Sequence, residues 1–344
     1  MTDISLEKKI AQMLMIGFDG YEVDENHHIS EAIGKYNLGG VILFDLEEKD
    51  YRLKNIESHE QVQNLTANLQ SYSDNNLLIG IDYEGGQVNR LKEEYGFPKT
   101  FSQQHLGELN DPSLTYEKSA EMAGTLSGLG INLNFAPVVD LKINPENPII
   151  AKRERSYSSD PEVVTLHSKE FIKAHRQAGV LTCLKHFPGH GSSTADSHHG
   201  FVDISDTWSE SELIPYKKLV KDNLVDCVMS AHVFNRNIDP KYPATLSSIH
   251  IDQELRNEIG FNGVVFSDDL HMGAIKDNYT FEQTLNLAIN AGIDILIISY
   301  DEEYKENLCE NLIYTILRLV KDGSISQSRI DESYDRIILL KNKL

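Results

Sequence analysis

Residues 180–198 read VLTCLKHFPGHGSSTADSH, and they carry the strongest structural signal in the chain. The apolar run Val180 to Leu184 ends abruptly in Lys185-His186, and a Pro-Gly turn then opens a small polar loop. A short apolar run without clean alternation is typical of a parallel strand that is covered on both faces. The stretch therefore predicts a buried strand that delivers charged side chains to a cleft, beside a loop that carries Asp196 and His198.

Seven other apolar runs along the chain share this character. The eight runs span residues 13–18, 40–44, 77–81, 131–139, 180–186, 226–233, 263–267 and 293–299. The segments between them, such as 161–178 and 281–291, have apolar residues at three-and-four spacing and are predicted to be helices. Eight strands that alternate with helices predict a single-domain (β/α)8 barrel of the TIM type over residues 1–344, and a doubly wound open sheet is the structural alternative.

Helix ends and the C-terminal tail agree with this pattern. Glycine, which commonly ends a helix, comes just before three of the strands. These glycines are Gly179, Gly260 and Gly292. The tail, residues 308–344, is predicted to form two helices separated by Asp322-Gly323-Ser324, with Ser326 or Ser328 as the N-cap of the second. We expect these helices to close the outer ring.

The composition is that of a globular protein, with 40% hydrophobic and 25% charged residues, and the net charge is −21. Negative charge repels nucleic-acid phosphates and anionic membranes, so we expect neither as a partner. The N-terminus lacks the profile of a secretory signal, and no apolar run reaches the roughly 18 residues that a membrane helix needs. Three scattered cysteines predict neither a disulfide framework nor a cysteine metal site. We expect a cytoplasmic monomer that uses no cofactor.

Polar residues lie where several of the predicted strands end. In chain order they are Asp82, Asp140, Lys185-His186, His232 (within the sixth strand) and Asp268. The carboxyl ends of all strands in a (β/α)8 barrel meet at one face, where the loops build the active site. The sequence therefore predicts one cluster of charged side chains at this face.

Asp268 follows the seventh apolar run and is itself followed by Asp269. Adjacent side chains alternate in direction, so one carboxylate can face the barrel mouth while the other is held by the backbone or by a cation. A carboxylate aimed into a cleft can act as a nucleophile, a base, a metal ligand or a cation clamp.

The loop after the fifth strand places Asp196 two residues before His198. At this spacing the carboxylate can orient the imidazole, which titrates near neutral pH and can give up and recover a proton. Glycines in the same loop are expected to let it swing. They are Gly189, Gly191 and Gly200.

A zinc site is the competing interpretation of this loop, because four histidines lie close in sequence. They are His186, His190, His198 and His199. Their spacing does not match the His-Glu-x-x-His motif of zinc metalloproteases. The first strand ends in Gly17-Phe18-Asp19 rather than in the His-x-His of metal-dependent barrel hydrolases. We therefore expect no catalytic metal.

A third polar cluster runs from Asp82 to Arg90. Asp82 can bind hydroxyl groups of a substrate, and Arg90 can add a charge-assisted hydrogen-bond donor. Arg153 and Arg155, beyond the fourth strand, are further candidates for contacts to a polar ligand.

These segments resemble glycoside hydrolase family 3, in particular its bacterial β-N-acetylglucosaminidase (NagZ-type) branch. The resemblance is carried by the stretch from Lys185 to Gly191 with Asp196-Ser197-His198, and it extends through nearly the whole barrel into the tail. The other matching segments are 81–90, Arg155-Ser156-Tyr157, Ala231-His232-Val233, 266–272 and Arg329-Ile330-Asp331-Glu332-Ser333.

The resemblance implies a retaining glycosidase. The residue matching Asp268 is then the nucleophile, and His198 with Asp196 forms the acid/base dyad, in place of the second carboxylic acid that most glycosidases use. The resemblance also implies a set of residues that bind the sugar in the −1 subsite. These are Asp82, Arg90, Arg155, Lys185 and His186.

The expected activity is that of an exo-β-N-acetylglucosaminidase that removes terminal β-GlcNAc, with peptidoglycan fragments of the cell wall as a candidate substrate. A phosphorylase or a β-glucosidase on the same scaffold, and a sugar-binding protein without chemistry, are the alternatives. Tyr83 and Gln87 replace residues that are common in the branch, and the loop 192–195 lacks its usual acidic or amide residue. These departures leave the roles of the site residues intact, and they bear on which leaving group the enzyme prefers.

Overall fold

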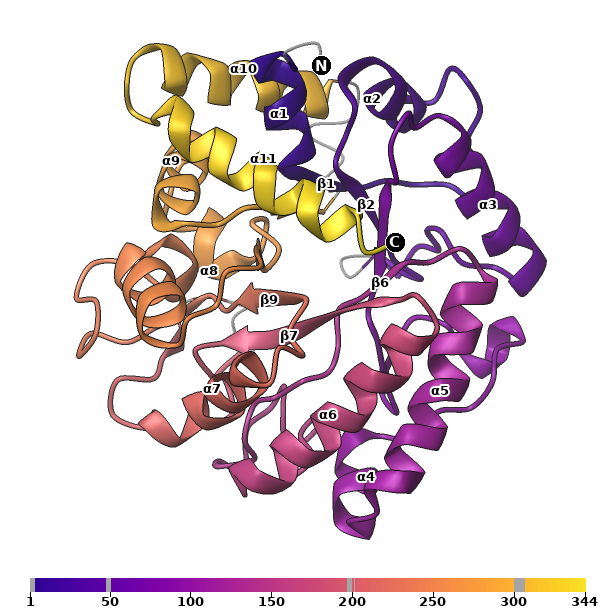
Figure 1. The fold of residues 1–344 in the computed structure, drawn as a ribbon, viewed down its shortest axis with the longest axis vertical. Coiled ribbons are helices and arrows are strands. Elements are labelled where there is room, and N and C mark those ends of the chain that lie inside the picture. Colours follow the sequence, from indigo (N-terminus) through magenta and orange to yellow (C-terminus); the bar gives the residue numbers. More distant parts are fainter. Residues whose placement is uncertain (1–3, 48–50, 197–199, 201, 300–306) are drawn as a thin grey trace.

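Eight parallel strands form the centre of the computed structural model, which describes residues 4–47, 51–196, 200, 202–299 and 307–344. The barrel strands are β1 (Leu14–Gly17), β2 (Gly40–Leu43), β3 (Leu78–Ile81), β6 (Leu133–Asn134), β7 (Leu181–Phe187), β9 (Cys227–Ser230), β11 (Val264–Ser267) and β12 (Leu296–Ile298). One helix follows each strand, and these helices surround the strands in Figure 1. They are α2 (His28–Tyr36), α3 (His59–Ser71), α5 (Pro112–Gly128), α6 (Pro161–Gln177), α7 (Ile214–Lys221), the π-helix η5 (Ile249–Glu258), α9 (Phe281–Ala291) and α10 (Leu308–Lys321).

The sheet closes on itself. Its strand order is β11-β9-β7-β6-β3-β2-β1-β12, and a parallel bridge between Phe266 and Ile295 joins the two ends. Phe266 also packs edge-to-face on Phe135, with 5.5 Å between the ring centroids. Phe266 is in β11 and Phe135 directly follows β6, and these two strands are not neighbours in the sheet, so the rings meet inside the barrel. The prediction of a (β/α)8 barrel is therefore confirmed, and the open doubly wound sheet is excluded.

All eight predicted strands and the two predicted helices are present. The buried faces explain the sequence pattern, because each barrel strand is buried at every position and so has no polar alternation. The three glycines predicted at helix ends have the positive φ angles that favour glycine: Gly179 (74°), Gly260 (83°) and Gly292 (111°). In the tail, α11 (Gln327–Lys341) begins after Ser326, whose hydroxyl accepts the Arg329 N–H.

Two of the runs differ most from the prediction. The run 131–139 shortens to β6, and the run 226–233 divides into β9 and β10 (Val233–Phe234), which leaves His232 between two strands. β10 pairs in parallel with β8 (Val202–Asp203). A second ribbon joins β4 (Tyr83–Gly85) to β5 (Val88–Asn89). These elements of two or three residues are too short to show a hydrophobic period.

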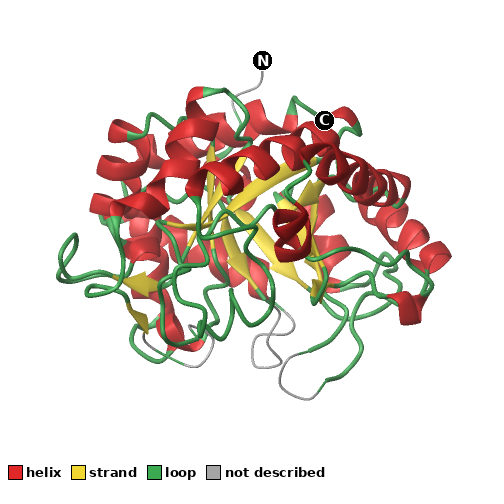
Figure 2. Cartoon of the chain, turned by 90° about the horizontal axis from the view of Figure 1, so that it is seen from below, coloured by secondary structure: helices red, strands yellow, loops and turns green. Residues whose placement is uncertain are grey.

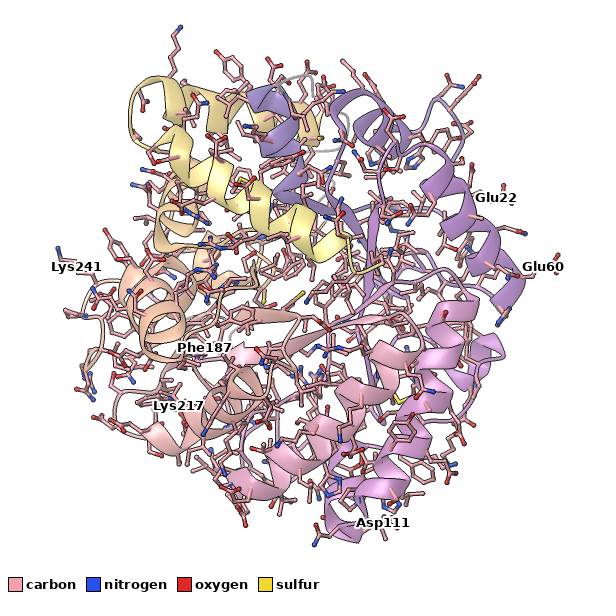
Figure 3. All side chains as sticks on the ribbon, in the orientation of Figure 1. Glu22, Glu60, Asp111, Phe187, Lys217 and Lys241 are labelled. Atoms are coloured by element: carbon pink, nitrogen blue, oxygen red, sulfur yellow. The ribbon has the colours of Figure 1, made fainter. Side chains whose placement is uncertain are left out.

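Shorter elements complete the described fold. They are α1 (Leu6–Gln12), η1 (Glu93–Tyr95), α4 (Gln103–Leu109), η3 (Glu210–Leu213), η4 (Ala244–Leu246) and α8 (Gly273–Lys276). Figure 2 shows the long loops gathered on one side of the strands, which is the side that holds the site described below. In Figure 3 the charged side chains of Glu22, Glu60, Asp111 and Lys241 lie at the rim of the molecule, whereas Phe187, at the end of β7, lies inside.

A buried carboxylate at the amino ends of the barrel strands binds the C-terminal tail. Asp294, just before β12, accepts hydrogen bonds from Arg256 (2.7 Å), Arg329 (2.7 Å), Ser333 (2.8 Å) and Arg336 (3.1 Å). Three of these partners belong to α11, and both α10 and α11 also pack against α1. Within the described ranges, no helix is both long and apolar enough to cross a membrane.

Candidate active site

Lys185 is the centre of a buried ion cluster at the carboxyl end of the barrel. Its Nζ lies 2.6 Å from Asp82 Oδ1 and 2.6 Å from Glu84 Oε1, and the lysine is only 2% exposed. Asp82 follows β3 and keeps 18% of its side chain exposed. The cluster therefore exposes part of one carboxylate above a lysine that is almost fully buried.

Glu84 joins this lysine to Arg155. The carboxylate accepts two hydrogen bonds from the guanidinium, at 2.8 Å from Nε and 2.7 Å from Nη2, while Nη1 donates to the Ile149 carbonyl (3.1 Å). Burial alone raises the pKa of Glu84, but Arg155 and Lys185 outweigh it, so the net pKa is lowered and the carboxyl stays ionised. Glu84 was not among the predicted site residues. Its place two residues after Asp82, on the same side of a short strand, was the available signal.

His186 is held between a carboxylate and the same arginine. Its Nδ1 lies 2.7 Å from Asp140 Oδ2, and its Nε2 lies 3.1 Å from Arg155 Nη2. Because a guanidinium can only donate, Nε2 accepts and Nδ1 carries the proton that goes to Asp140. Burial and the charges of Arg155 and Lys185 lower the pKa of His186 well below its usual value, so the imidazole is neutral.

Arg90 lies between two carboxylates, Asp82 after β3 and Asp45 after β2. Its Nη2 lies 3.8 Å from Asp82 Oδ2, and its Nη1 lies 3.2 Å from Oδ1 of the buried Asp45, which also binds Lys92 (2.5 Å). Burial raises the pKa of Asp82, but the charges of Lys185 and Arg90 overcome this effect and lower the pKa to about 2. Asp82 is therefore ionised at neutral pH.

Asp268 lies just beyond β11, close enough to His186 and His190 that its negative charge partly offsets the lowering of the pKa of both imidazoles. Its Oδ1 accepts the Asp269 N–H (2.9 Å), and its own N–H donates to the Ser230 carbonyl (3.2 Å). Asp269 points elsewhere: its Oδ1 accepts the N–H groups of His271 and Ser299, both at 3.0 Å. The pair alternates as predicted, with Asp268 toward the site and Asp269 held by the backbone.

A short chain of hydrogen bonds supports the peptide that follows Asp269. His232 Nε2 lies 2.9 Å from the Asp269 carbonyl, so it is the protonated nitrogen, and its Nδ1 lies 2.9 Å from Thr245 Oγ1. Thr245 Oγ1 lies 2.9 Å from Ser230 Oγ. His232 thus contacts the backbone of the Asp268 loop.

The loop after β7 begins with a tightly held stem, residues 188–193. His190 N–H donates to Asp140 Oδ1 (2.8 Å), and Asn147 Nδ2 donates to the His190 carbonyl (2.8 Å). A Cβ on Gly191 would lie 1.7 Å from the Leu141 carbonyl oxygen. The expectation that Gly189 and Gly191 let the loop swing is therefore wrong for the stem, since these glycines permit close packing instead.

The proposed dyad lies farther along this loop. Asp196 is half-buried, and His198 lies outside the described residues, as does His199. Arg153 is exposed, unlike the buried Arg155. Of the predicted site residues, the structure brings together Asp82, Arg90, Arg155, Lys185, His186 and Asp268. Among the described side chains, no three His, Cys, Asp or Glu residues are grouped so that they could hold a metal ion.

Comparison with known proteins identifies the family of the chain. The family model described as the glycosyl hydrolase family 3 N terminal domain matches residues 5–340. The chain is 34% identical to a beta-hexosaminidase from Tolumonas auensis over 287 residues, which covers 83% of this chain and 81% of the relative. It is 32% identical to beta-hexosaminidase A from Pseudoalteromonas piscicida, with 92% of this chain covered but only 55% of that relative.

Solved structures show the same likeness. A family 3 β-N-acetylglucosaminidase from Paenibacillus sp. str. FPU-7 superposes with a TM-score of 0.89 at 36% identity, covering 99% of this chain and 63% of that one. A β-N-acetylhexosaminidase from Beutenbergia cavernae gives a TM-score of 0.88 at 25% identity, covering 99% and 100%. This chain belongs to glycosyl hydrolase family 3, and it is a glycoside hydrolase.

Proposed function

We propose that this chain is a retaining exo-β-N-acetylglucosaminidase that removes terminal β-GlcNAc from glycosides, with fragments of peptidoglycan as the natural substrate class. The observation that carries the proposal is the convergence of Asp268 with the Asp82–Lys185–Arg155–His186 cluster at one end of the barrel. The names of the relatives support the choice of sugar, since beta-hexosaminidases and β-N-acetylglucosaminidases are similar to this chain over most of its length.

The ion cluster is suited to hold a sugar in the −1 subsite. Asp82 and Lys185 offer an acceptor and a donor to vicinal hydroxyl groups, and their salt bridge fixes both side chains before substrate arrives. Arg155 is already fixed by two hydrogen bonds to Glu84, so little side-chain entropy is lost when it binds a ligand. Arg90 adds a second cation at the edge.

Asp268 is assigned as the nucleophile. Its carboxylate attacks the anomeric carbon, the bond to the aglycone oxygen breaks, and a covalent glycosyl-aspartate forms. The hydrogen bond from the Asp269 N–H orients the carboxylate for this attack. The neutral state of His186 matters here, because a cationic imidazole beside Asp268 would pair with the carboxylate and weaken its nucleophilicity.

His198, oriented by Asp196, is assigned as the acid/base. In the first step the imidazolium gives its proton to the leaving oxygen, and in the second step the neutral imidazole takes a proton from water as the water attacks the glycosyl-enzyme. The sugar leaves with its β configuration retained, because each step inverts the anomeric carbon once.

One experiment separates this proposal from its alternatives. Rates are compared for nitrophenyl β-GlcNAc and nitrophenyl β-glucoside, in buffers with and without phosphate. We expect kcat/KM to favour β-GlcNAc by at least about 10²-fold, the size of effect expected when a well-placed polar contact is lost. Equal rates on the two sugars would support a β-glucosidase, and a sugar 1-phosphate as the product in phosphate buffer would support a phosphorylase.

A further inference from the structure

Glu212 lies directly beneath the stem of the β7 loop, residues 188–193. It belongs to the short 3-10 helix η3, is 1% exposed, and its Oε2 accepts the Gly191 N–H at 3.1 Å. Gly189 has a φ of +123°, and a Cβ on it would lie 2.7 Å from both Cβ and Oε2 of Glu212. The side chain is therefore packed against one glycine of the stem and hydrogen-bonded to the next.

Other groups also hold the stem, at its two ends and at His190, but none of them contacts the Gly191 N–H or packs on Gly189 as Glu212 does. Trp208, two residues before η3, donates its Nε1–H to the Pro188 carbonyl (3.0 Å), and Asn144 Nδ2 donates to the Ser193 carbonyl (2.8 Å). At its start the stem follows Phe187, which packs edge-to-face on Tyr216 with 5.3 Å between the ring centroids. Glu212 contacts the middle of the stem, so a displacement of its side chain would move the backbone at Gly189 and Gly191.

We propose that Glu212 is a positioning residue: it fixes the stem of the β7 loop through Gly189 and Gly191 and so sets where Asp196, three residues beyond the stem, lies. The inference rests on the proposed function, because it assigns the importance of this loop to Asp196 and His198. Glu212 itself touches no reacting atom. Its effect on the reaction is to hold the loop in one place, and small displacements of a catalytic group cost about 10²-fold in rate.

The chemistry of the carboxyl makes this anchor sensitive to pH. Burial raises the pKa of Glu212 to about 8, the Asp140 carboxylate adds to the rise, and the dipoles of Ser192 and Gly191 oppose it. The titratable groups around it are Asp140 beyond β6, Tyr216 on α7 and His190 in the stem; burial raises the pKa of Tyr216 and lowers that of His190. Glu212 is thus neutral at pH 7. Above about pH 8 its charge needs water and meets repulsion from Asp140, and the stem loosens.

Two variants test the proposal. Glu212→Ala removes the acceptor and leaves space beside Gly189, whereas Glu212→Gln keeps the shape and does not titrate. The matched control is Glu210→Gln, at an exposed position of the same helix turn. Hydrogen exchange of the peptide that contains residues 188–193 is measured first. We expect exchange at Gly191 to become at least about tenfold faster in Glu212→Ala at pH 7. Between pH 7 and 9, after correction for the intrinsic rate, protection should fall in the wild type but not in Glu212→Gln.

Kinetics supply the second readout. Glu212→Ala should slow a disaccharide by about 10²-fold in kcat while KM changes little, and it should slow an activated nitrophenyl glycoside much less. Glu212→Gln should recover most of this loss at pH 7 and should keep its activity to higher pH than the wild type does. Unchanged exchange at Gly191 in both Glu212 variants would overturn the positioning role whatever the activities are. Faster exchange with equal slowing of both substrates would uphold the anchor and would instead count against the dyad of the proposed function.

Discussion

Lys185 Nζ and Glu84 Oε1 lie 2.6 Å apart, and each residue is only 2% exposed. The lysine has a second carboxylate, Asp82, and the glutamate has a second cation, Arg155. Burial lowers the pKa of Lys185, but the charges of Asp82 and Glu84 outweigh it and raise the pKa overall. The four groups thus form two cations and two anions whose charges balance, and removal of any one leaves an unpaired charge in a buried place.

Glu84→Gln is expected to destabilise the protein, because it leaves a buried positive charge without its partner. The neutral amide leaves Arg155 and Lys185 to share Asp82, so the free energy of unfolding should fall by about 3–5 kcal/mol, as is typical when one partner of a buried ion pair is removed. KM should rise because Lys185 and Arg155 are no longer fixed. Urea denaturation and steady-state kinetics measure the two effects. Glu146→Gln, at an exposed ion pair with Lys152, is the control, and an equally small effect of both variants would show that Glu84 does not hold the cluster.

The two adjacent aspartates are expected to behave differently. Asp268→Ala should lower turnover by about 10⁴-fold or more, because no other group can form the glycosyl-enzyme. Asp269→Asn keeps an oxygen that can accept the N–H groups of His271 and Ser299, so it should cost less than about tenfold. A 5-fluoro N-acetylglucosaminyl fluoride should label Asp268, as read by mass spectrometry of the peptide. A label on Asp269 or Asp140 would remove Asp268 from this role.

The barrel could be predicted from the sequence because its signals are local. Residues 181–187 and 264–267 are continuous apolar runs, since both faces of each strand are buried, and Gly292 ends a helix with a φ angle that disfavours other residues. Ser326 likewise caps α11 through a contact within one turn. Such features depend on near neighbours along the chain, and the sequence displays them directly.

Glu84 and Glu212 could not be predicted in the same way. Glu84 meets Arg155 across 71 positions of the chain, and Glu212 meets Gly191 across 21. Both look in the sequence like ordinary charged residues, and only the closed barrel makes them buried. The interpretation of Gly189 as a swinging joint failed for the same reason, because the side chain that packs on it comes from another segment.

Lys341, near the end of α11, provides a prediction about stability and pH. It is 4% exposed, its Nζ has no hydrogen-bond partner in the described part of the chain, and burial lowers its pKa to about 7. An unfolded chain keeps this lysine protonated up to about pH 10.4, so the unfolded state binds more protons between these values and stability should rise with pH by up to about 1.4 kcal/mol per unit. Lys341→Met should be more stable than the wild type at pH 7, and the advantage should shrink toward pH 10.

Urea denaturation at pH 7, 8.5 and 10 measures this effect. Lys321→Met, at the exposed end of α10, serves as the control and should show no such trend. A constant difference between Lys341→Met and the wild type at all three values would mean that the lysine keeps its charge in the folded protein.

The acid/base dyad is tested by comparing substrates with good and poor leaving groups. His198→Ala should slow a natural disaccharide far more than a nitrophenyl glycoside, because only the poor leaving group needs a proton, and the gap should be about 10²–10⁴-fold. Asp196→Ala should give a weaker form of the same pattern, since this residue orients the imidazole and transfers no proton. Azide should partly rescue His198→Ala in the second step, where it needs no general base, and the product should be the β-glycosyl azide. Equal slowing of both substrates, with no effect of azide, would make His198 a binding residue and would move the search for the acid/base to another group at this end of the barrel.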